Sequence, residues 1–490
     1  MTTVRRSLLL SLAERYFGIL IQLISFFVLA RLLTPAQIGL YSVAAATIGL
    51  AQVVRDFGIG SYLIQESDIT PERVRTAFTL TGLISLASFL ILVGIAPWLA
   101  GFYDHPELGL ILQVLAINFL LIPFSSTALA LLRRSMNFKA LFWIATAANL
   151  ISTLGAIGCA AAGLGAWSLV ASSIANTLVT ALMAAWFADG GFLHRPCLLE
   201  WRRILHFGGQ STLARTISEI ALSFNDLVVG RVLGFAEVGL LSRAQGVMSL
   251  FHRDVMAAIR NVAYPAFANS HRNNQGLDEI HTRSVSMVAA FAWPFYGLFA
   301  LFPTEALRLM FGPQWDAAAA LVPIFCAAGA VAVLWSLVST ALTASGHVNL
   351  TVRIELVIQP VRIALLVACA WVFRTLESFA YVLLLTYVIQ IAVTYTAKQS
   401  VMKTDFVALR RELSQSFRLS LVALAPACAL RAGLMLFDFR LPDLVVFPLA
   451  GLLTLAGWLT GLWVVKHRLL SDPMLERPRA WLEKHFFARS

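Results

Sequence analysis

Polar and charged side chains recur at helical spacing inside long apolar segments of this chain. In the first such segment the steps are four, three, four and three residues, through Ser11, Arg15, Gly18, Gln22 and Ser25. This spacing places all five on one face of a helix. An ionised side chain at the centre of a bilayer costs roughly 3 kcal/mol or more, so such residues normally face a protein interior or a water-filled cavity. The first segment is therefore predicted to turn a polar stripe toward a cavity.

Three further apolar segments carry similar stripes. The members are Ser211, Arg215, Ser218, Glu219, Asn225 and Asp226 in the seventh segment, Ser42, Gly49, Gln52, Arg55 and Asp56 in the second, and Ser242, Gln245, Ser249, His252, Arg253 and Arg260 in the eighth. The first and seventh segments occupy corresponding places in a 200-residue repeat described below, and so do the second and eighth. Four stripes at matching places predict one shared cavity.

Arginine dominates the predicted lining, with Arg15, Arg55, Arg215, Arg243, Arg253 and Arg260. A guanidinium group keeps its charge when buried, and its planar fork binds phosphate oxygens in pairs. The lining therefore favours a substrate that carries a phosphate or pyrophosphate. Four carboxylates in the same stripes, Glu14, Asp56, Glu219 and Asp226, are candidates for coupling transport to H⁺ or Na⁺. Residue type does not decide between these two ions.

The alternative interpretation of these charges is structural. Residues near the ends of spans can extend to water, and neighbours can pair, as in Glu14–Arg15, Arg55–Asp56 and Arg253–Asp254. Three other charged residues, Glu355, Arg362 and Arg431, have no counterparts at repeat-equivalent positions. Glu355 and Arg362 are seven residues apart and share a helix face, and for them the structural interpretation is favoured.

Composition identifies a membrane protein with several spans. The hydrophobic fraction is 59% and the charged fraction 13%, whereas soluble domains carry roughly 25% charged residues. The net charge of +11 does not indicate a nucleic-acid surface, because the basic residues lie in short loops between apolar runs. The five cysteines show neither disulfide-framework nor metal-ligand spacing, and no cofactor or metal is expected.

Fourteen apolar segments are long enough to cross a membrane as helices. They are expected at about 8–33, 39–60, 77–101, 108–132, 140–162, 164–187, 205–230, 239–262, 284–307, 317–342, 351–373, 377–398, 414–437 and 444–466. If the N-terminus is cytoplasmic, the inner segments hold 24 Lys and Arg, the outer loops five and the spans eight, together the 37 of the chain. Basic residues prefer the cytoplasmic side, so both termini are predicted to lie there.

An internal repeat explains how the stripes correspond. The stretch RLLTPAQIGLYSVA at 31–44 returns as RVLGFAEVGLLSRA at 231–244, with seven identities in fourteen positions and no gap. Each copy is predicted to be a tight turn that leads into a helix. In the first copy, Thr34 is predicted to cap this helix together with Gln37. Gly39 and Gly239 are expected to let a neighbouring backbone approach closely. Because each repeat contains six spans, both enter from the same side, and the repeats are parallel.

The predicted organisation is all-α. It comprises a six-helix lobe at 1–187, a cytoplasmic connector at 188–204, a second six-helix lobe at 205–398, two additional helices within 399–466, and a basic and aromatic cytoplasmic tail at 467–490. Two basic stretches, 194–203 and 398–418, are expected to link these parts. The end of the tail, PRAWLEKHFFARS, mixes aromatic and basic residues and is predicted to lie on the anionic inner leaflet of the membrane.

Several segments resemble one known family. They are ARLLTPAQIGLYSVAAA at 30–46, RRSMNFKAL at 133–141, GRVLGFAEVGLLSRA at 230–244, VAYPAFA at 262–268, FGPQW at 311–315 and ALTASGHVN at 341–349. Their order along the whole chain resembles the polysaccharide transporter family (lipopolysaccharide and exopolysaccharide flippases) of the multidrug/oligosaccharidyl-lipid/polysaccharide exporter superfamily. The resemblance implies two six-helix lobes with two extra C-terminal helices. It also implies cavity cations that meet a lipid pyrophosphate, and the matching positions are Arg15, Arg55, Arg215, Arg253 and Arg260.

The expected function is therefore a flippase without covalent chemistry. It would move undecaprenyl-diphosphate-linked oligosaccharide across the bacterial inner membrane for O-antigen or exopolysaccharide synthesis, by alternating access. The implied partners are the lipid-linked oligosaccharide, membrane lipid, H⁺ or Na⁺, a polysaccharide polymerase and a chain-length regulator. The first alternative is a cation-coupled drug exporter of the same fold, for which an acidic and aromatic cavity would be expected. The second is a polymerase or ligase, for which the outward loops offer only Asp104 and Glu107 as neighbouring acids.

Overall fold

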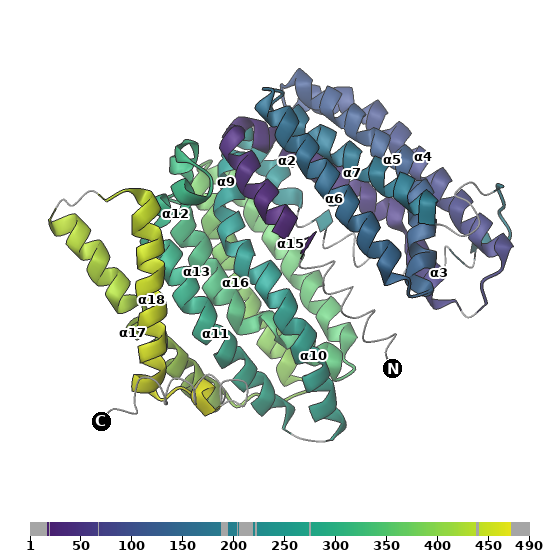
Figure 1. The fold of residues 1–490 in the computed structure, drawn as a ribbon. Helices are drawn as coiled ribbons and strands as arrows, with labels where there is room; N and C mark the ends of the chain where they lie inside the picture. The colour runs from purple at the N-terminus through teal and green to yellow at the C-terminus, as the bar shows by residue number, and fades with distance from the viewer. Residues whose placement is uncertain are drawn as a thin grey trace. The chain divides into compact units, whose positions relative to one another are not determined.

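The structure is a computed structural model of the chain (Figure 1). It describes residues 17–18, 20–66, 68–187, 195–202, 204, 219–220, 223–273, 276–437 and 441–471. These residues form helices and turns, with no strand among them. The chain divides into two compact units, Met1–Leu240 and Leu241–Ser490. The predicted lobe boundaries at 187 and 205 were derived from the sequence repeat, whereas the two units are defined by their compactness. The lobe boundaries therefore stay a prediction.

The described residues of the first unit form several helices, some of which begin with a side-chain cap. They are a segment at 20–32, α2 (Pro35–Asp56), α3 (Ile59–Gln65), α4 (Pro71–Phe102), α5 (Pro106–Arg134), α6 (Phe138–Ala161) and α7 (Trp167–Phe187). At α2, the backbone N–H of Gln37 donates to Thr34 Oγ1 at 3.3 Å, and the backbone N–H of Thr34 donates to Gln37 Oε1 at 3.0 Å. This confirms the predicted capping box. In Figure 1, α4 and α5 run side by side as a long antiparallel pair.

The repeated turns pack through their glycines. A Cβ atom on Gly39 would overlap the carbonyl group of Phe235, and one on Gly239 would overlap the carbonyl group of Pro35. Only glycine permits this approach of two backbones. The glycine shared by both repeat copies is thus required by the contact, as predicted. Gly234 precedes α9 with a φ of 117°, a conformation that also favours glycine.

The second unit contains most of the remaining helices. They are α9 (Phe235–Ser249, shared with the first unit), a π-helix (Leu250–Val255), α10 (Met256–Arg272), α11 (Leu277–Leu301), α12 (Pro303–Met310), a 3₁₀ turn (Pro313–Ala318), α13 (Val322–Ser336), α14 (Val338–Ala344), α15 (Val348–Val372), α16 (Leu376–Gln399), α17 (Phe406–Leu436), α18 (Asp443–Val465) and a 3₁₀ turn (Arg468–Ser471). In Figure 1, α11, α13 and α16 lie together, and α17 and α18 follow beside α11.

Eleven helices of the described part are long and apolar enough to cross a membrane. They correspond to the expected spans two to six and nine to fourteen. The first and seventh expected spans lie partly outside the described residues, and their described parts are helical at 20–32 and 223–232. The chain is an all-α polytopic membrane protein.

Some predicted boundaries are wrong. The eighth span was expected to be one α-helix over 239–262, whereas the π-helix interrupts it and α10 continues to Arg272. The basic stretch expected as a linker up to Arg418 is largely helical, because α17 begins at Phe406. Asp405 caps that helix by accepting from the amides of Val407 and Ala408 at 2.9 and 3.0 Å. The basic residues that predict a linker up to Arg418 thus lie mostly in the first turns of α17.

Candidate functional site

A polar pocket of about 420 Å³ lies in the first unit, where α2 ends and α3 packs beside α5. Its lining combines two arginines, one carboxylate, several hydroxyl groups and small apolar residues. The members are Arg55, Asp56, Gly58, Ile59, Gly60, Ser61, Leu63, Ile64, Thr81, Ile122, Ser125, Ser126, Thr127, Leu129, Ala130 and Arg133. The volume falls within the range of small-molecule sites, roughly 300–1,000 Å³. Two predicted site residues, Arg55 and Asp56, therefore share a cavity.

A sharp change of chain direction holds Arg55 at this pocket. Phe57 and Gly58 have φ values of 28° and 65°, so α2 stops and α3 begins at Ile59. The apolar face of α3, including Tyr62 and Leu63, is buried in one cluster with Ala77 of α4 and Ala130 of α5. That packing fixes the turn, and with it the end of α2, beside α5.

Arg55 is both locally paired and turned into the pocket. Its Nη2 atom lies 2.8 Å from Asp56 Oδ1, and 11% of its side chain is exposed against 52% for Asp56. The Arg55 Nε atom is buried and has no hydrogen-bond partner in the part of the chain that the structure describes. The predicted local ion pair between Arg55 and Asp56 is thus present. The ion pair engages Nη2, so the Nε–H, one of the five N–H donors of the guanidinium group, is not used by it.

Two adjacent arginines at the end of α5 do different things. Arg134 Nη1 donates to the carbonyl groups of Leu63 and Ile64, both at 3.2 Å, and also to that of Glu66. It therefore caps the C-terminus of α3. Arg133 instead lines the pocket as an exposed side chain. In the sequence both residues are cations of a predicted loop, and the two-residue stretch gives no signal that separates them.

Hydroxyl groups line the pocket beside the arginines. Thr81 Oγ1 donates to the Ala77 carbonyl at 2.8 Å, and Ser125 Oγ donates to the Ile122 carbonyl at 3.1 Å. Thr127 differs from them, because its Oγ1 atom is buried and has no partner among the described residues, while the residue is only 4% exposed. An unpaired buried hydroxyl costs about 1–3 kcal/mol. Such a group calls for an explanation, and a ligand is one.

Glu219, a predicted coupling residue, lies against α2. A Cβ on Gly49 would come within 2.9 Å of Glu219 Oε1, and Ser223 Oγ lies 3.5 Å from the same oxygen. Gly49 belongs to the stripe of the second span and Glu219 to that of the seventh. The structure thus brings these two predicted stripes together within the first unit. Asp226 is half-buried in the helical segment 223–232.

A network of amides and hydroxyls in the same unit was not singled out from the sequence. Asn118 Nδ2 donates to Ser173 Oγ at 3.0 Å, joining α5 to α7. Asn176 Nδ2 donates to Asn149 Oδ1 at 3.2 Å, joining α7 to α6. Gly18 of the first predicted stripe approaches Asn149, with an added Cβ at 3.7 Å from its Nδ2. A single asparagine inside each of the apolar helices α6 and α7 would have been the available signal.

In the second unit, the predicted stripe of the eighth span coincides with the π-helix. His252 and Arg253 lie within it, and Arg260 follows in α10. π-helical turns occur frequently at functional sites. The His252 ring lies 5.9 Å from the Trp335 ring and 6.2 Å from the Tyr387 ring, and its Nδ1 atom is buried without a partner. Arg253 is exposed and Arg260 half-buried.

Three charged residues of the second unit contact other side chains of the protein. Arg243, predicted to line the cavity, is 7% exposed and lies over the rings of Phe311 and Trp315 at 5.7 and 5.5 Å. Arg243 lines neither the polar pocket of the first unit nor the pocket between α13, α16 and α17, and its place in the cavity lining stays a prediction. Arg431 forms an ion pair with Glu305. Glu355 accepts a hydrogen bond from Gln359 at 2.6 Å.

The remaining predicted residues, Glu14, Arg15 and Arg215, lie outside the described residues. The joining of all four stripes in one cavity stays a prediction for the same reason. Asp254 is described only in its backbone.

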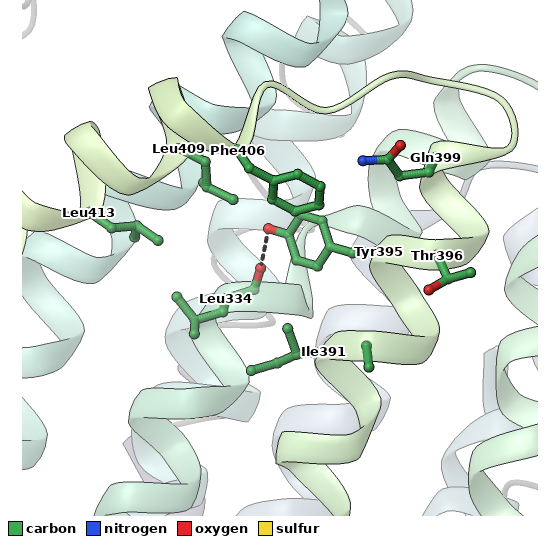
Figure 2. A pocket seen from close by; sticks show the side chains of 9 residues that line it. Leu334, Ile391, Tyr395, Thr396, Gln399, Phe406, Leu409 and Leu413 are labelled. Carbon is green, nitrogen blue, oxygen red and sulfur yellow. Dashed lines mark hydrogen bonds between the residues drawn. The ribbon is translucent and has the colours of Figure 1, made fainter.

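A second pocket, of about 540 Å³, lies between α13, α16 and α17 (Figure 2). Most of its lining is aliphatic or aromatic, and its polar groups come from Tyr395, Thr396 and Gln399. The Tyr395 hydroxyl donates to the Leu334 carbonyl at 2.8 Å, as Figure 2 shows, so its hydrogen is already used within the protein. With no cation in its lining, this pocket is unsuited to a diphosphate.

Comparison with known proteins agrees with this architecture. The teichuronic acid biosynthesis protein TuaB of Bacillus subtilis (strain 168) is 23% identical over 401 residues, which cover 78% of this chain and 82% of that protein. The succinoglycan biosynthesis transport protein ExoT of Rhizobium meliloti (strain 1021) is 27% identical over 297 residues, 59% of this chain and 58% of that one.

The fold is also found in a solved structure, the lipid II flippase MurJ in an inward closed conformation. The TM-score is 0.73 at 12% identity, and the match covers 93% of this chain and 98% of that one. A family model described as polysaccharide biosynthesis protein matches residues 28–320, which is more than half of the chain. By that match, on top of the helical architecture, the chain belongs to this family of polysaccharide biosynthesis proteins.

Proposed function

We propose that this protein is a flippase for undecaprenyl-diphosphate-linked oligosaccharide, acting in the synthesis of a surface polysaccharide. The observation that carries the proposal is Arg55, a nearly buried guanidinium with an unpartnered N–H in a polar pocket of a membrane protein. A charged donor in that position suits a phosphate oxygen. The names of the relatives support the same direction, since they refer to teichuronic acid and to succinoglycan transport.

The physical task is to carry a sugar diphosphate head group through hydrocarbon. Arginines and hydroxyls replace the water around the head group, while the polyprenyl tail stays in lipid. Arg15, Arg215, Arg253 and Arg260 are proposed to take part with Arg55, and Glu14, Asp56, Glu219 and Asp226 to couple movement to H⁺ or Na⁺. We place the protein in the inner membrane of a bacterium with both termini in the cytoplasm, because this orientation would put 24 basic residues on the cytoplasmic side and five outside.

The test is transport by the purified chain in proteoliposomes, followed with a fluorescent lipid-linked oligosaccharide. Arg55→Ala should lower the initial rate about tenfold to a hundredfold, because a hydrogen bond to a charged group contributes about 1.5–3 kcal/mol. Arg55→Lys should recover part of the rate, since it keeps the charge without the planar fork. Arg374→Ala, at an exposed position after α15, serves as the control and should transport normally. Transport of a cationic drug, with none of the lipid, would overturn the proposal in favour of a drug exporter.

A further inference from the structure

The hydroxyl-lined part of the polar pocket offers a site that the transport of a diphosphate alone does not explain. A guanidinium group only donates hydrogen bonds, whereas a hydroxyl both donates and accepts. Arg55 and Arg133 therefore match the phosphates, while Thr127 matches a partner that is itself a hydroxyl. Sugar rings carry such hydroxyls, and the ring attached to the diphosphate is necessarily adjacent to it.

We infer that Thr127 binds a hydroxyl group of the sugar that is directly attached to the diphosphate, and so determines which sugar this flippase accepts. The inference rests on the proposed function. In this arrangement Arg55 and Arg133 contact the phosphates, and the sugar ring occupies the space between α3 and α5. The pocket of about 420 Å³ is of the size that small-molecule sites have.

The state of the Thr127 hydroxyl is the principal observation. Thr81, Ser125 and Ser126 also line the pocket, but each donates its hydroxyl hydrogen to a carbonyl group of its own helix. Thr127 does not, although threonine in a helix can form this bond. Its Oγ1 atom is buried and unpartnered in a residue that is 4% exposed. Thr127 belongs to the lining of the pocket, and its hydroxyl has no partner in the described part of the chain.

A buried hydroxyl of this kind can discriminate strongly. A site built to bond a substrate hydroxyl rejects an analogue that lacks it, because the polar group of the site is then left unpaired. Arginine contacts to phosphate cannot make this distinction, since every lipid-linked oligosaccharide carries the same diphosphate. In this inference Thr127 selects between sugars, and the two arginines provide the affinity that is common to all of these lipids.

The experiment compares lipids with and without a sugar. The full-length chain in lipid nanodiscs is tested for binding of undecaprenyl diphosphate and of the same lipid carrying glucose or galactose, by native mass spectrometry. Thr127→Val removes the hydroxyl and keeps the shape. It should weaken binding of the preferred sugar-bearing lipid about tenfold and leave undecaprenyl diphosphate unchanged, while Thr127→Ser should bind like the wild type. Arg55→Ala should instead weaken all three lipids alike.

Two controls separate this inference from a structural effect. Thr76→Val removes another buried hydroxyl, which donates to the Glu72 carbonyl at 2.9 Å and does not line the pocket, and it should change no affinity. Thr127→Val should not lower the melting temperature, because its hydroxyl has no partner within the protein. A lower melting temperature together with equal losses for all three lipids would overturn the inference.

The outcomes also separate the inference from the proposed function. If Thr127→Val binds all three lipids as the wild type does, the sugar contact is wrong, while binding and transport by the wild type still support a flippase. If the wild type binds none of the three lipids, the flippase proposal fails and the inference fails with it.

Discussion

Lys398 is completely buried, and its ammonium nitrogen lies 2.5 Å from Oδ1 of Asp278. The other oxygen of Asp278 accepts a hydrogen bond from the Asp405 amide at 3.0 Å. His281 Nδ1 lies 3.1 Å from the same ammonium group. One carboxylate therefore joins the start of α11, the end of α16 and the residue that caps α17.

Asp278→Asn should destabilise the second unit strongly. Removal of one partner of a buried ion pair leaves the other charge without compensation and costs about 3–5 kcal/mol. We expect a large fall in melting temperature, measured by thermal unfolding of the purified protein in detergent. The matched control is Asp104→Asn, which removes an exposed partner of Arg231 at 3.9 Å and should cost less than about 1 kcal/mol. Equal effects of the two variants would show that the Lys398 pair contributes little.

Gly39→Ala should prevent the close packing of the repeated turns. The added methyl group would overlap the Phe235 carbonyl group, and overpacking a tight contact typically costs about 1–3 kcal/mol. Gly155→Ala is the control, because nothing lies within 4 Å of a Cβ there. It lies inside α6, where alanine is favoured over glycine by about 1 kcal/mol. Folded protein recovered after gel filtration should fall for Gly39→Ala and hold or rise for Gly155→Ala.

The neighbours Arg133 and Arg134 should give opposite phenotypes. Arg134→Ala removes donors to three carbonyl groups at the end of α3 and should lower the melting temperature. Arg133→Ala removes a pocket charge and should reduce transport of the lipid-linked oligosaccharide at an unchanged melting temperature. Transport is measured in proteoliposomes, normalised to the amount of protein. A destabilised Arg133→Ala, or a stable Arg134→Ala, would contradict these assignments.

Cys197 should be unusually reactive and accessible only from the cytoplasm. Hydrogen bonding with the Leu199 backbone, and to a lesser degree with the Thr76 side chain, lowers the pKa of the Cys197 thiol. The thiolate is the reactive form, so iodoacetamide should alkylate Cys197 at a lower pH than it alkylates a free cysteine. Thr76→Val should shift this pH dependence upward. The predicted orientation is tested with the same thiol and with His105→Cys.

An impermeant thiol reagent added to intact cells should label the cysteine placed at position 105 and leave Cys197 unlabelled. The reverse pattern would invert the membrane orientation inferred from the basic residues.

The sequence by itself determined the class of fold and much of the local structure. Long apolar runs predict membrane helices because about twenty apolar residues cross the hydrocarbon core as a helix, and a helix pairs its backbone groups within the segment. The capping box of Thr34 and Gln37 could be predicted because it involves neighbours three residues apart. The glycines at 39 and 239 were recognised through the repeat. The resemblance pointed to a family of polysaccharide transporters, and the match of a polysaccharide biosynthesis family model to residues 28–320 agrees with it.

Tertiary structure decided which polar side chains have partners. Arg55, Arg243 and Arg134 look alike in the sequence, but they line a pocket, lie over aromatic rings and cap a helix, respectively. Thr127 is one hydroxyl among many until packing removes it from water without giving it a bond. Hydropathy and helix capping depend on residues that are close together in the sequence, so they can be predicted from it. Burial and pairing of a side chain depend on groups that lie far apart in the chain, so only the tertiary structure determines them.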